Sequence, residues 1–466
     1  MKIMQRRGIF LTLIISASFA IPLIAQAAVY NVSTVAGGGA TTCDSTSRPG
    51  STININGAWG ISADGLGNVY YVDRSHYVVC KIDSSGNVTR VAGTGSSATG
   101  ADNIQATSSS LIDPINVISD ANGVLYIADY SGCSCIRKVA TNGNITTIYN
   151  TAHGTAYTGV NGLATSATGA QPMGLALSPS GELYFTYWAT PKIMKIDSNG
   201  YLRYVAGTGS NANTGDGGLA TSADIGQSSS IDFDSAGNLY IGIYASCVRK
   251  IETSTGNIST YAGICGSSGT TGDGGAATSA LLAGPWDIGF DKADNLYIAQ
   301  RLGTAVRMVE KSTGYMRTVA GINGSTGALD STTANSTFST LYGVVAASNG
   351  DLYISDVGNN KIRKVAGLAM MVSPGPPTIT FSSIVKFNTP FALTASGGSS
   401  GKITFYANGK RIAGCIAKDY TNTVVCNWKP SNRGAVTVFA EVTTSGNTKY
   451  RSSDLKISVA NRTTTR

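Results

Sequence analysis

A motif of eight residues recurs six times along the chain, and this repeat constrains the fold more than any other feature. Each copy centres on a tyrosine in a short run of alternating apolar residues, as in LGNVYYVD (66–73). Successive tyrosines are 56, 58, 56, 57 and 56 residues apart, and they are Tyr70, Tyr126, Tyr184, Tyr240, Tyr297 and Tyr353. Such a period indicates that one supersecondary unit is repeated and stacked.

Each repeat contains up to four strand-like segments. A first apolar run leads through an Asp/Asn/Gly turn into the tyrosine strand. A third run alternates basic and apolar residues, as in CIRKVA (135–140), and a fourth follows as in RVAG (90–93). Four strands in a repeat of this length are typical of a propeller blade. The predicted fold class is therefore all-β, with a six-bladed β-propeller followed by a smaller domain.

The sixth repeat lacks its fourth strand, because the chain runs there into the Pro-rich segment 373–377. The segment TVAG (34–37) stands one period before RVAG (90–93). We therefore predict that residues 29–37 complete the last blade, which would hide both edges of the ring.

These units resemble NHL repeats over roughly residues 29–367. The resemblance rests on the GNLYIAD-type strands, on the run NKIRKV (360–365), and on the loops TGDGGLATSADI (214–225) and TGDGGAATSALL (271–282). It implies a six-bladed propeller and leaves the function open, since propellers serve many roles on one scaffold.

The N-terminus has the pattern of a secretory signal peptide. Basic residues in the first seven positions precede an apolar run (9–24) and the sequence Ala25-Gln26-Ala27. No later stretch approaches 18 apolar residues, so we expect an exported product, periplasmic, extracellular or on the cell surface, without a transmembrane segment after cleavage. The predicted parts are a signal peptide (1–27), an NHL-type propeller (28–372), a linker (373–377) and an immunoglobulin-like domain (378–466).

The C-terminal part contains several short alternating runs, with Asn408-Gly409 as a hairpin turn. The segment GKITFYANGKRIAG (401–414) is similar to bacterial immunoglobulin-like repeats. Residues 376–466 carry 12 − 3 = +9 charges, whereas residues 28–375 carry 19 − 23 = −4. The basic part could contact an anionic cell surface, although scattered lysines on a solvated sandwich are a simpler explanation. Nucleic-acid binding does not fit an exported, mildly acidic propeller.

Eight cysteines follow the signal peptide, an even number in an oxidising compartment, so we expect disulfides. Cys415 and Cys426 form the only pair in the small domain. Cys247 and Cys265 lie on loops that emerge on the same face of one blade. The remaining candidate pairs are Cys43 with Cys80 and Cys133 with Cys135. No cysteine is assigned a thiol-redox or zinc role.

Acidic side chains recur at two places in the repeats. Asp73, Asp129 and Asp356 end tyrosine strands, and Asp216 and Asp273 lie in the Gly-rich loops. One hypothesis is a ligand or calcium site where loops converge. The other is that these carboxylates fix turns by accepting backbone hydrogen bonds, and their periodic placement favours it.

Histidines are few. Only His76 and His153 are present, at different offsets in their repeats, and we interpret both as loop residues. Peptidyl-hydroxyglycine lyases of the NHL-propeller type rely on several histidines around a central zinc, and this chain cannot supply them. We assign no catalytic residue and no metal ligand, and calcium is the only cofactor we consider.

Tryptophans give the remaining candidates. Trp59 and Trp286 occupy equivalent positions at the start of a first strand, and Tyr187 and Trp188 stand at the end of a tyrosine strand where other repeats have Asp. They could form a platform for a sugar or peptide, or pack between blades. The preferred hypothesis is an exported binding or scaffold protein whose propeller loops bind a protein, peptide or glycan. The alternative is a metal-dependent lyase or hydrolase acting at the central channel.

Overall fold

The structure is a computed structural model that describes residues 31–153, 158–333 and 335–367, together with parts of 378–459. In the last range the described segments are 378–381, 391–396, 401–416, 418–420, 423–431, 434–443, 449–451 and 455–459. The predicted signal peptide and linker lie outside the described residues. Among the described residues, no helix combines the length and the apolar character that crossing a membrane would require.

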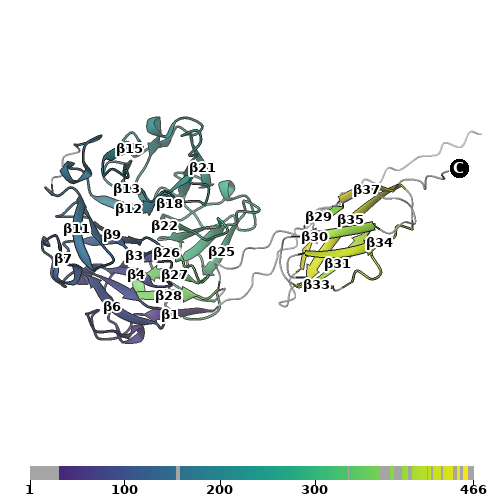
Figure 1. Cartoon of the computed structure of the whole chain (residues 1–466), viewed down its shortest axis with the longest axis horizontal. Helices are drawn as coiled ribbons and strands as arrows, with labels where there is room; N and C mark the ends of the chain where they lie inside the picture. Colours follow the sequence, from purple (N-terminus) through teal and green to yellow (C-terminus); the bar gives the residue numbers. More distant parts are fainter. Residues whose placement is uncertain are drawn as a thin grey trace, which may run out of the picture.

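Six antiparallel sheets form the blades, and in five of them consecutive strands run from the centre to the rim (Figure 1). Blade 1 contains β3 (Ala58–Ala63), β4 (Val69–Asp73), β5 (Val78–Ile82) and β6 (Asn87–Ala92). Blade 2 contains β8 (Pro114–Ser119), β9 (Leu125–Asp129), β10 (Cys135–Val139) and β11 (Asn144–Tyr149). Blade 3 contains β12 (Pro172–Leu177), β13 (Leu183–Tyr187), β14 (Lys192–Ile196) and β15 (Leu202–Ala206). Blade 4 contains β18 (Ser228–Phe233), β19 (Leu239–Ile243), β20 (Cys247–Ile251) and β21 (Ile258–Gly263). Blade 5 contains β22 (Pro285–Phe290), β23 (Leu296–Gln300), β24 (Ala305–Val309) and β25 (Met316–Gly321).

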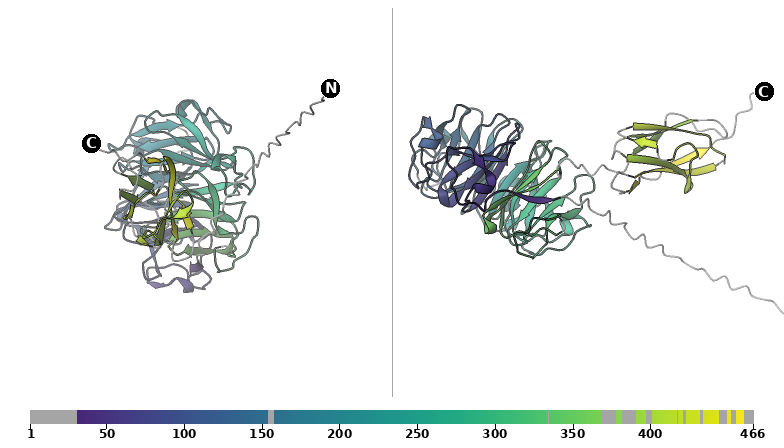
Figure 2. Two further views of the ribbon diagram at one scale, coloured as in Figure 1. Left: turned by 90° about the vertical axis from the view of Figure 1, so that its right-hand side faces the viewer. Right: turned by 90° about the horizontal axis from the view of Figure 1, so that it is seen from below.

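The sixth blade takes its outermost strand from the other end of the chain. It contains β26 (Leu341–Ala346), β27 (Leu352–Asp356), β28 (Lys361–Val365) and β1 (Val32–Ala36). β1 pairs antiparallel with β28, with Val32 opposite Val365. Figure 1 and Figure 2 show the purple β1 beside the green strands of this blade. The predicted closure by the N-terminal segment is confirmed.

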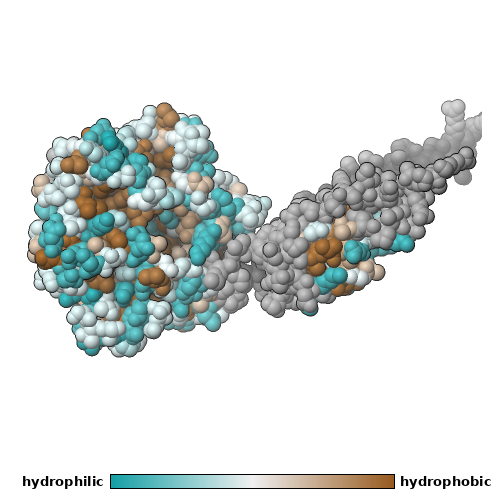
Figure 3. Space-filling view, in the orientation of Figure 1, coloured by the Kyte–Doolittle hydropathy of each residue, from teal (hydrophilic) through white to brown (hydrophobic). Residues whose placement is uncertain are grey.

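The inner strands form a closed ring, since each contacts the next in the order β3, β8, β12, β18, β22, β26 and again β3. The prediction of a six-bladed propeller is thus confirmed. Short rim strands extend the sheets of blades 1 and 2, which sequence reasoning missed: β2 (Arg48–Pro49) and β7 (Ile104–Gln105). A two-stranded ribbon pairs β16 (Asn213–Thr214) with β17 (Asp224–Ile225). Figure 3 shows apolar residues scattered among hydrophilic ones on the propeller surface in view.

Single-turn 3-10 helices occupy the loops between blades and the turns after two of the tyrosine strands. They are η1 (Gly50–Thr52), η2 (Arg74–His76), η3 (Ala106–Ser108), η4 (Ala164–Ser166), η5 (Ala220–Ser222), η6 (Ala277–Ser279) and η7 (Val357–Asn359). Four of them repeat the sequence Ala-Thr-Ser, and the alanine of each is buried. The small apolar residue thus anchors the loop against the blade.

The repeated tyrosine fixes the turn that precedes it. Tyr240 Oη donates a hydrogen bond to Asp234 (3.1 Å), and Asp234 also accepts one from the Asn238 backbone N–H (2.9 Å). The same arrangement joins Tyr70 to Asp64 (3.0 Å) and Tyr297 to Asp291 (3.1 Å). Because a buried carboxylate needs several donors, Asp, turn and Tyr act as one unit. This bond explains the tyrosine of blades 1, 4 and 5, where phenylalanine could not donate it.

Each blade is also bonded to the next by at least one polar side chain. At the six interfaces these bonds are Ser62–Ser119 (3.1 Å), Asn116–Met173 O (3.1 Å), Thr186–Ser228 O (3.0 Å), Ser229–Pro285 O (3.1 Å), Val344 N–Asp287 (2.9 Å) and Gly57 N–Asn360 (3.0 Å). These bonds supplement the apolar clusters between neighbouring blades and fix the angle between them.

The described C-terminal strands form two antiparallel sheets. One contains β29 (Thr378–Phe381), β30 (Phe391–Ser396) and β34 (Thr423–Trp428). The other contains β31 (Gly401–Ala407), β32 (Lys410–Arg411), β33 (Lys418–Tyr420), β35 (Gly434–Thr443), β36 (Lys449–Arg451) and β37 (Leu455–Val459). Both contribute to one apolar core. The predicted hairpin turn is present, with positive φ at Asn408 (45°) and Gly409 (75°).

Glycine is required where inner strands approach each other. A Cβ at Gly60 would lie 2.6 Å from Cα of Asn116 in the next blade. We predict that Gly60→Ala lowers the free energy of unfolding by about 1–3 kcal/mol, because the neighbouring backbone must shift. Denaturant unfolding of the purified protein measures this. Gly218→Ala is the control, since a Cβ there meets only Gly215 O at 3.5 Å, and we expect a change within about 0.5 kcal/mol. An equal loss in both variants would contradict the packing argument.

Candidate functional site

Twelve equivalent side chains surround one mouth of the channel, two from each blade. The second residues of the inner strands form an inner ring: Trp59, Ile115, Met173, Ser229, Trp286 and Tyr342. The residues that follow the tyrosine strands form an outer ring: Arg74, Tyr130, Trp188, Tyr244, Arg301 and Val357. We call these the mouth rings. Six of the twelve residues are aromatic, and the two charged ones are arginines.

Trp286 lies at the centre of this aromatic cluster. It stacks on Tyr342 with ring centroids 4.6 Å apart, and it contacts Trp188 at 5.5 Å and Trp59 at 6.1 Å. These partners come from blades 6, 3 and 1, so one side chain of blade 5 bridges the channel. Trp286 is 8% exposed, whereas Trp59, Trp188 and Tyr342 are half-buried. The cluster therefore closes the channel and leaves aromatic surface at its mouth.

Both arginines lie over aromatic rings. The Arg74 guanidinium is 4.0 Å from the centroid of Trp59, and that of Arg301 is 4.7 Å from Trp286 and 5.1 Å from Tyr342. A guanidinium stacked on a ring keeps its N–H donors at its edge. Those of Arg74 are donated to Asp113, whereas Arg301 has no carboxylate partner among the described residues. The mouth rings thus offer flat apolar faces next to fixed positive charge.

The channel beneath the mouth is nearly filled. The cavity there is about 20 Å³, room for about one water, and it is lined by Gly60, Asn116 and Asp287 among others. A ligand at this mouth would therefore lie on the rings and not enter the channel.

Two carboxyl groups face the channel. Asp287 accepts a hydrogen bond from Val344 N–H (2.9 Å), and Asp232 accepts one from Phe290 N–H (3.0 Å). Burial raises the pKa of Asp287 to about 7 and that of Asp232 to about 6. Each would be partly protonated near neutral pH. Both bonds connect neighbouring blades, so the structural role of these groups is clear.

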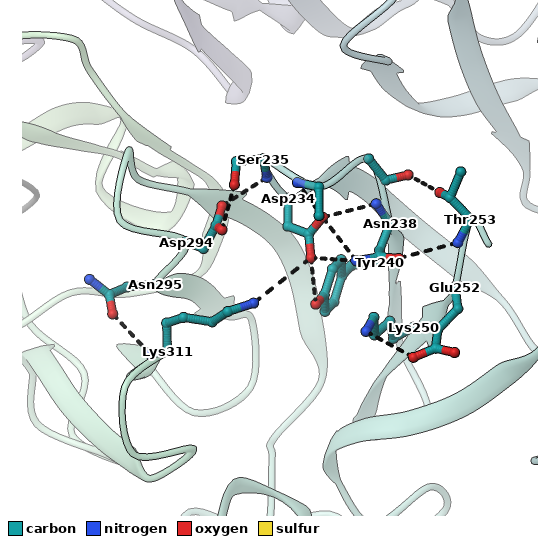
Figure 4. A network of polar contacts seen from close by, with 12 residues as sticks. Asp234, Ser235, Asn238, Tyr240, Lys250, Glu252, Thr253, Asp294, Asn295 and Lys311 are labelled. Carbon is teal, nitrogen blue, oxygen red and sulfur yellow. Dashed lines mark hydrogen bonds and ion pairs between the residues drawn. The ribbon is translucent and has the colours of Figure 1, made fainter.

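The opposite mouth holds a cavity of about 560 Å³ at the ends of the inner strands of blades 3 to 6. Figure 4 shows the polar network beside it. Asp294 accepts bonds from Ser235 N (2.8 Å) and Oγ (2.7 Å), and Lys292 donates to Ser348 O (3.2 Å). Lys311 lies 4.0 Å from Asp234. Each of these contacts joins two neighbouring blades, so these polar groups already have partners.

Asp216 and Asp273 lie away from the mouth rings, in loops, each paired with an arginine from a third strand. Asp216 pairs with Arg249, and Asp273 with Arg307 (2.5 Å). Both arginines are almost completely buried. Although partial burial acts to raise it, bonds from Thr260 and Arg249 hold the pKa of Asp216 below its usual value. These contacts account for both aspartates without a ligand.

In each of the other blades, a loop is also fastened to the third strand, but not always by an ion pair. Two further blades use Arg137–Asp102 (3.0 Å) and Arg363–Asp330 (2.6 Å). In blade 1 the arginine position holds Cys80, which is bonded to Cys43. In blade 3 it holds Met194, which shares an apolar cluster with Val160. An ion pair, a disulfide or an apolar contact thus fastens each loop to its blade.

The aspartates that end tyrosine strands are buried and accept backbone hydrogen bonds. Asp129 accepts from Ile112 N (3.0 Å) and Asp113 N (2.6 Å), and Asp356 from Ser339 N (2.8 Å). Asp73 accepts from Asn56 N (2.9 Å) and contacts His76 Nδ1 (2.8 Å). The hydrogen bond with Asp73 raises the pKa of His76.

All four cysteine pairs considered from the sequence are bonded in the structure: Cys43–Cys80, Cys133–Cys135, Cys247–Cys265 and Cys415–Cys426. His153 Nδ1 lies 3.1 Å from Cys133 Sγ. Within the described residues, this His with Cys133 and Cys135 is the one group close enough to share a metal ion. Its sulfurs are joined to each other, and it belongs to the outer part of blade 2.

The structure brings together Trp59, Trp188 and Trp286 of the residues named from the sequence. It adds Tyr130, Tyr244, Tyr342, Arg74 and Arg301, which sequence reasoning missed. Aligning the residue after each tyrosine strand across the six repeats would have revealed the outer ring, because equivalent positions of a propeller meet at one mouth.

The fold defines the chain as a β-propeller protein, and solved structures agree. A protein of unknown function from Bacteroides thetaiotaomicron matches with TM-score 0.54 and 19% identity, covering 72% of this chain and 75% of that one. An auxiliary nutrient binding protein from the same species matches with TM-score 0.53 and 18% identity, covering 72% and 76%. Another from Bacteroides ovatus matches with TM-score 0.52 and 17% identity, covering 72% and 76%. At these identities the likeness shows the fold alone. No protein-family model matches the sequence, and neither does any curated protein.

The ion pair of Asp216 with Arg249 leads to a prediction about stability. We expect Asp216→Ala to lower the free energy of unfolding by about 1–3 kcal/mol, because Arg249 stays buried without its counter-charge. Denaturant unfolding measures it. Glu252→Ala is a matched control, since Glu252 is equally exposed (48% against 47%) in a looser pair with Lys250. We expect a change within about 0.5 kcal/mol there. Strong stabilisation of the natural protein by calcium, lost in Asp216→Ala, would show a ligand role instead.

A second prediction concerns pH. The pKa of Asp287 is raised from 3.8 to about 7, so the folded state prefers its protonated form. The stability it contributes is therefore greatest at acid pH and falls as pH rises from about 4 to about 7. Asp287→Asn keeps an acceptor for Val344 and removes the charge. We expect the variant to have a higher Tm than the natural protein at pH 8, with the gap closing near pH 4. A gap independent of pH would contradict this.

Proposed function

We propose that the chain is an exported binding protein that holds its ligand on the mouth rings of an NHL-type propeller. The observation that carries the proposal is the gathering of half-buried tryptophans and tyrosines from five of the six blades at one mouth. Large aromatic side chains left partly exposed at a concave surface favour ligand binding, since they contribute much contact area at low entropic cost.

Export is supported by the signal-type N-terminus and by the four disulfides, which persist in oxidising compartments. Two of the solved neighbours are nutrient binding proteins. A binding role for this chain agrees with that description, but the proposal is based on the aromatic residues of the mouth rings.

The proposal includes a domain division at the linker 373–377 and an immunoglobulin-like fold for residues 378–466. This fold is supported by the two sheets with one core and by the Cys415–Cys426 bond. The net charge of +9 on residues 376–466 suits contact with an anionic cell surface. The tail would then act as spacer or contact module while the propeller binds the ligand.

The alternative is catalysis at the central channel. It is favoured by the raised pKa values of Asp232 and Asp287, because such carboxyls can act as general acids near neutral pH. Asp232 also lines the 560 Å³ cavity at the opposite mouth. Against it, both carboxyls bond backbone N–H groups of the next blade and hold the ring together.

Binding to an array of soluble glycans and peptides, followed by titration calorimetry on hits, tests the proposal. We expect Trp188→Ala to weaken binding about tenfold or more, because it removes an aromatic face of the outer ring. Tyr315→Ala is the control, since Tyr315 is 51% exposed and outside the mouth rings.

Three outcomes are distinct. Loss in Trp188→Ala with an unchanged control supports the mouth rings. Binding that depends on Asp232 and not on Trp188 moves the site to the opposite mouth. Turnover of a hit, abolished in Asp232→Asn, favours the catalytic alternative.

A further inference from the structure

The two arginines of the mouth rings differ in one respect. Arg74 is neutralised by Asp113 of the next blade, with Nε to Oδ1 at 2.6 Å and Nη2 to Oδ2 at 3.0 Å. Asp113 directly precedes the inner strand β8. The equivalent residue next to Arg301 directly precedes β26, and it is Thr340. The residue before the next inner strand therefore neutralises Arg74 but cannot neutralise Arg301.

No carboxylate among the described residues pairs with Arg301. Its guanidinium lies over Trp286, Tyr342 and Tyr244, with centroid distances of 4.7, 5.1 and 5.6 Å. The ring faces stabilise the cation, and the Tyr342 hydroxyl can accept one N–H, but neither neutralises the charge or accepts two donors side by side. A carboxylate can accept two of them side by side, and this pairing is favourable where water is partly displaced.

The neutral side chains of the mouth rings narrow the choice of ligand. The rings contain no Asn or Gln, and Ser229 is their only aliphatic hydroxyl. A peptide, whose backbone needs donors and acceptors along its length, would find few partners. A pyranose ring instead has an apolar C–H face that stacks on Trp or Tyr, with hydroxyls at its edge for Tyr O–H and Trp N–H groups. The filled channel also favours a ligand lying across the mouth.

Resting on the proposed function, we infer that the mouth rings bind an acidic saccharide, with a uronate carboxylate paired to Arg301 and the sugar rings stacked on the surrounding aromatic side chains. Arg301 binds the uronate carboxylate, and Trp188, Tyr244 and Tyr342 contact the sugar rings. Arg74, already paired, keeps Trp59 in place.

Titration calorimetry with an oligogalacturonate and its methyl ester tests this, because esterification removes the charge and keeps the sugar. We expect the natural full-length protein to bind the charged form about ten- to hundredfold more tightly. Arg301→Gln should abolish that preference, and Arg301→Lys should retain part of it. Arg203→Gln, a half-buried arginine on the fourth strand of blade 3, is the control and should keep the preference. Thermal unfolding verifies that each variant folds.

The outcomes separate this inference from the proposed function. Equal affinity for both forms, lost in Trp188→Ala, overturns the role of Arg301 and leaves binding at the mouth intact. Binding of acidic peptides but no saccharide overturns the ligand class. Tight uronate binding that survives both Trp188→Ala and Arg301→Gln overturns the inference and the proposed site together.

Discussion

The pairing of β1 with β28 is the interaction on which the rest of the structure depends. A ring of blades can bury the faces of all its sheets only if the last blade also packs against the first. Here the outermost strand of that last blade comes from the start of the chain, with Val32 opposite Val365. A further bond from Thr34 N to Asp330 (3.0 Å) fastens the same strand to the loop of the Arg363 pair. The closure therefore links both ends of the domain and pairs the outer edge of β28.

Closure also creates the candidate site. In a closed ring, six equivalent positions lie around one mouth, so each can be substituted without disturbing the strands that carry it. The third-strand position that fastens a loop to each blade is an example of such substitution. An ion pair, the Cys43–Cys80 disulfide and an apolar contact each fasten the loop in different blades. At the mouth, the same freedom has placed aromatic residues in all six blades and an arginine without a counter-charge in one. The scaffold thus keeps its strands and varies single positions, both the buried ones that fasten the loops and the partly exposed ones at the mouth.

Much of the fold could be predicted from the sequence, because the signals were local and repeated. The tyrosine strands, the third strands and the closing segment 34–37 follow from alternation and period, and the structure places β1 where the count requires it. The rim strands β2 and β7 could not be predicted, since each has two residues and no periodicity. The tyrosine–aspartate hydrogen bond could not be predicted from the sequence, because Tyr240 and Asp234 come together only when the turn between them is folded.

The site was predictable only in part. Trp59 and Trp286 stood out as rare residues at equivalent positions, and Trp188 as a departure from the repeat. Arg301 carried no such signal, because an arginine after a strand is ordinary in a solvated loop. The role inferred for Arg301 depends on Thr340, which lies 39 residues further along and replaces the acid found next to Arg74. Such a missing partner can be recognised only once the repeats are superposed in space.

Hydrogen exchange of individual backbone amides tests the closure most directly. If β1 is an integral strand of the last blade, its amides paired with β28 exchange as slowly as those between β27 and β28, and they open in the same cooperative unit. Fast exchange of residues 32–36, with all six blades still protected, would contradict the account, since the ring would then hold together without the strand that is meant to close it.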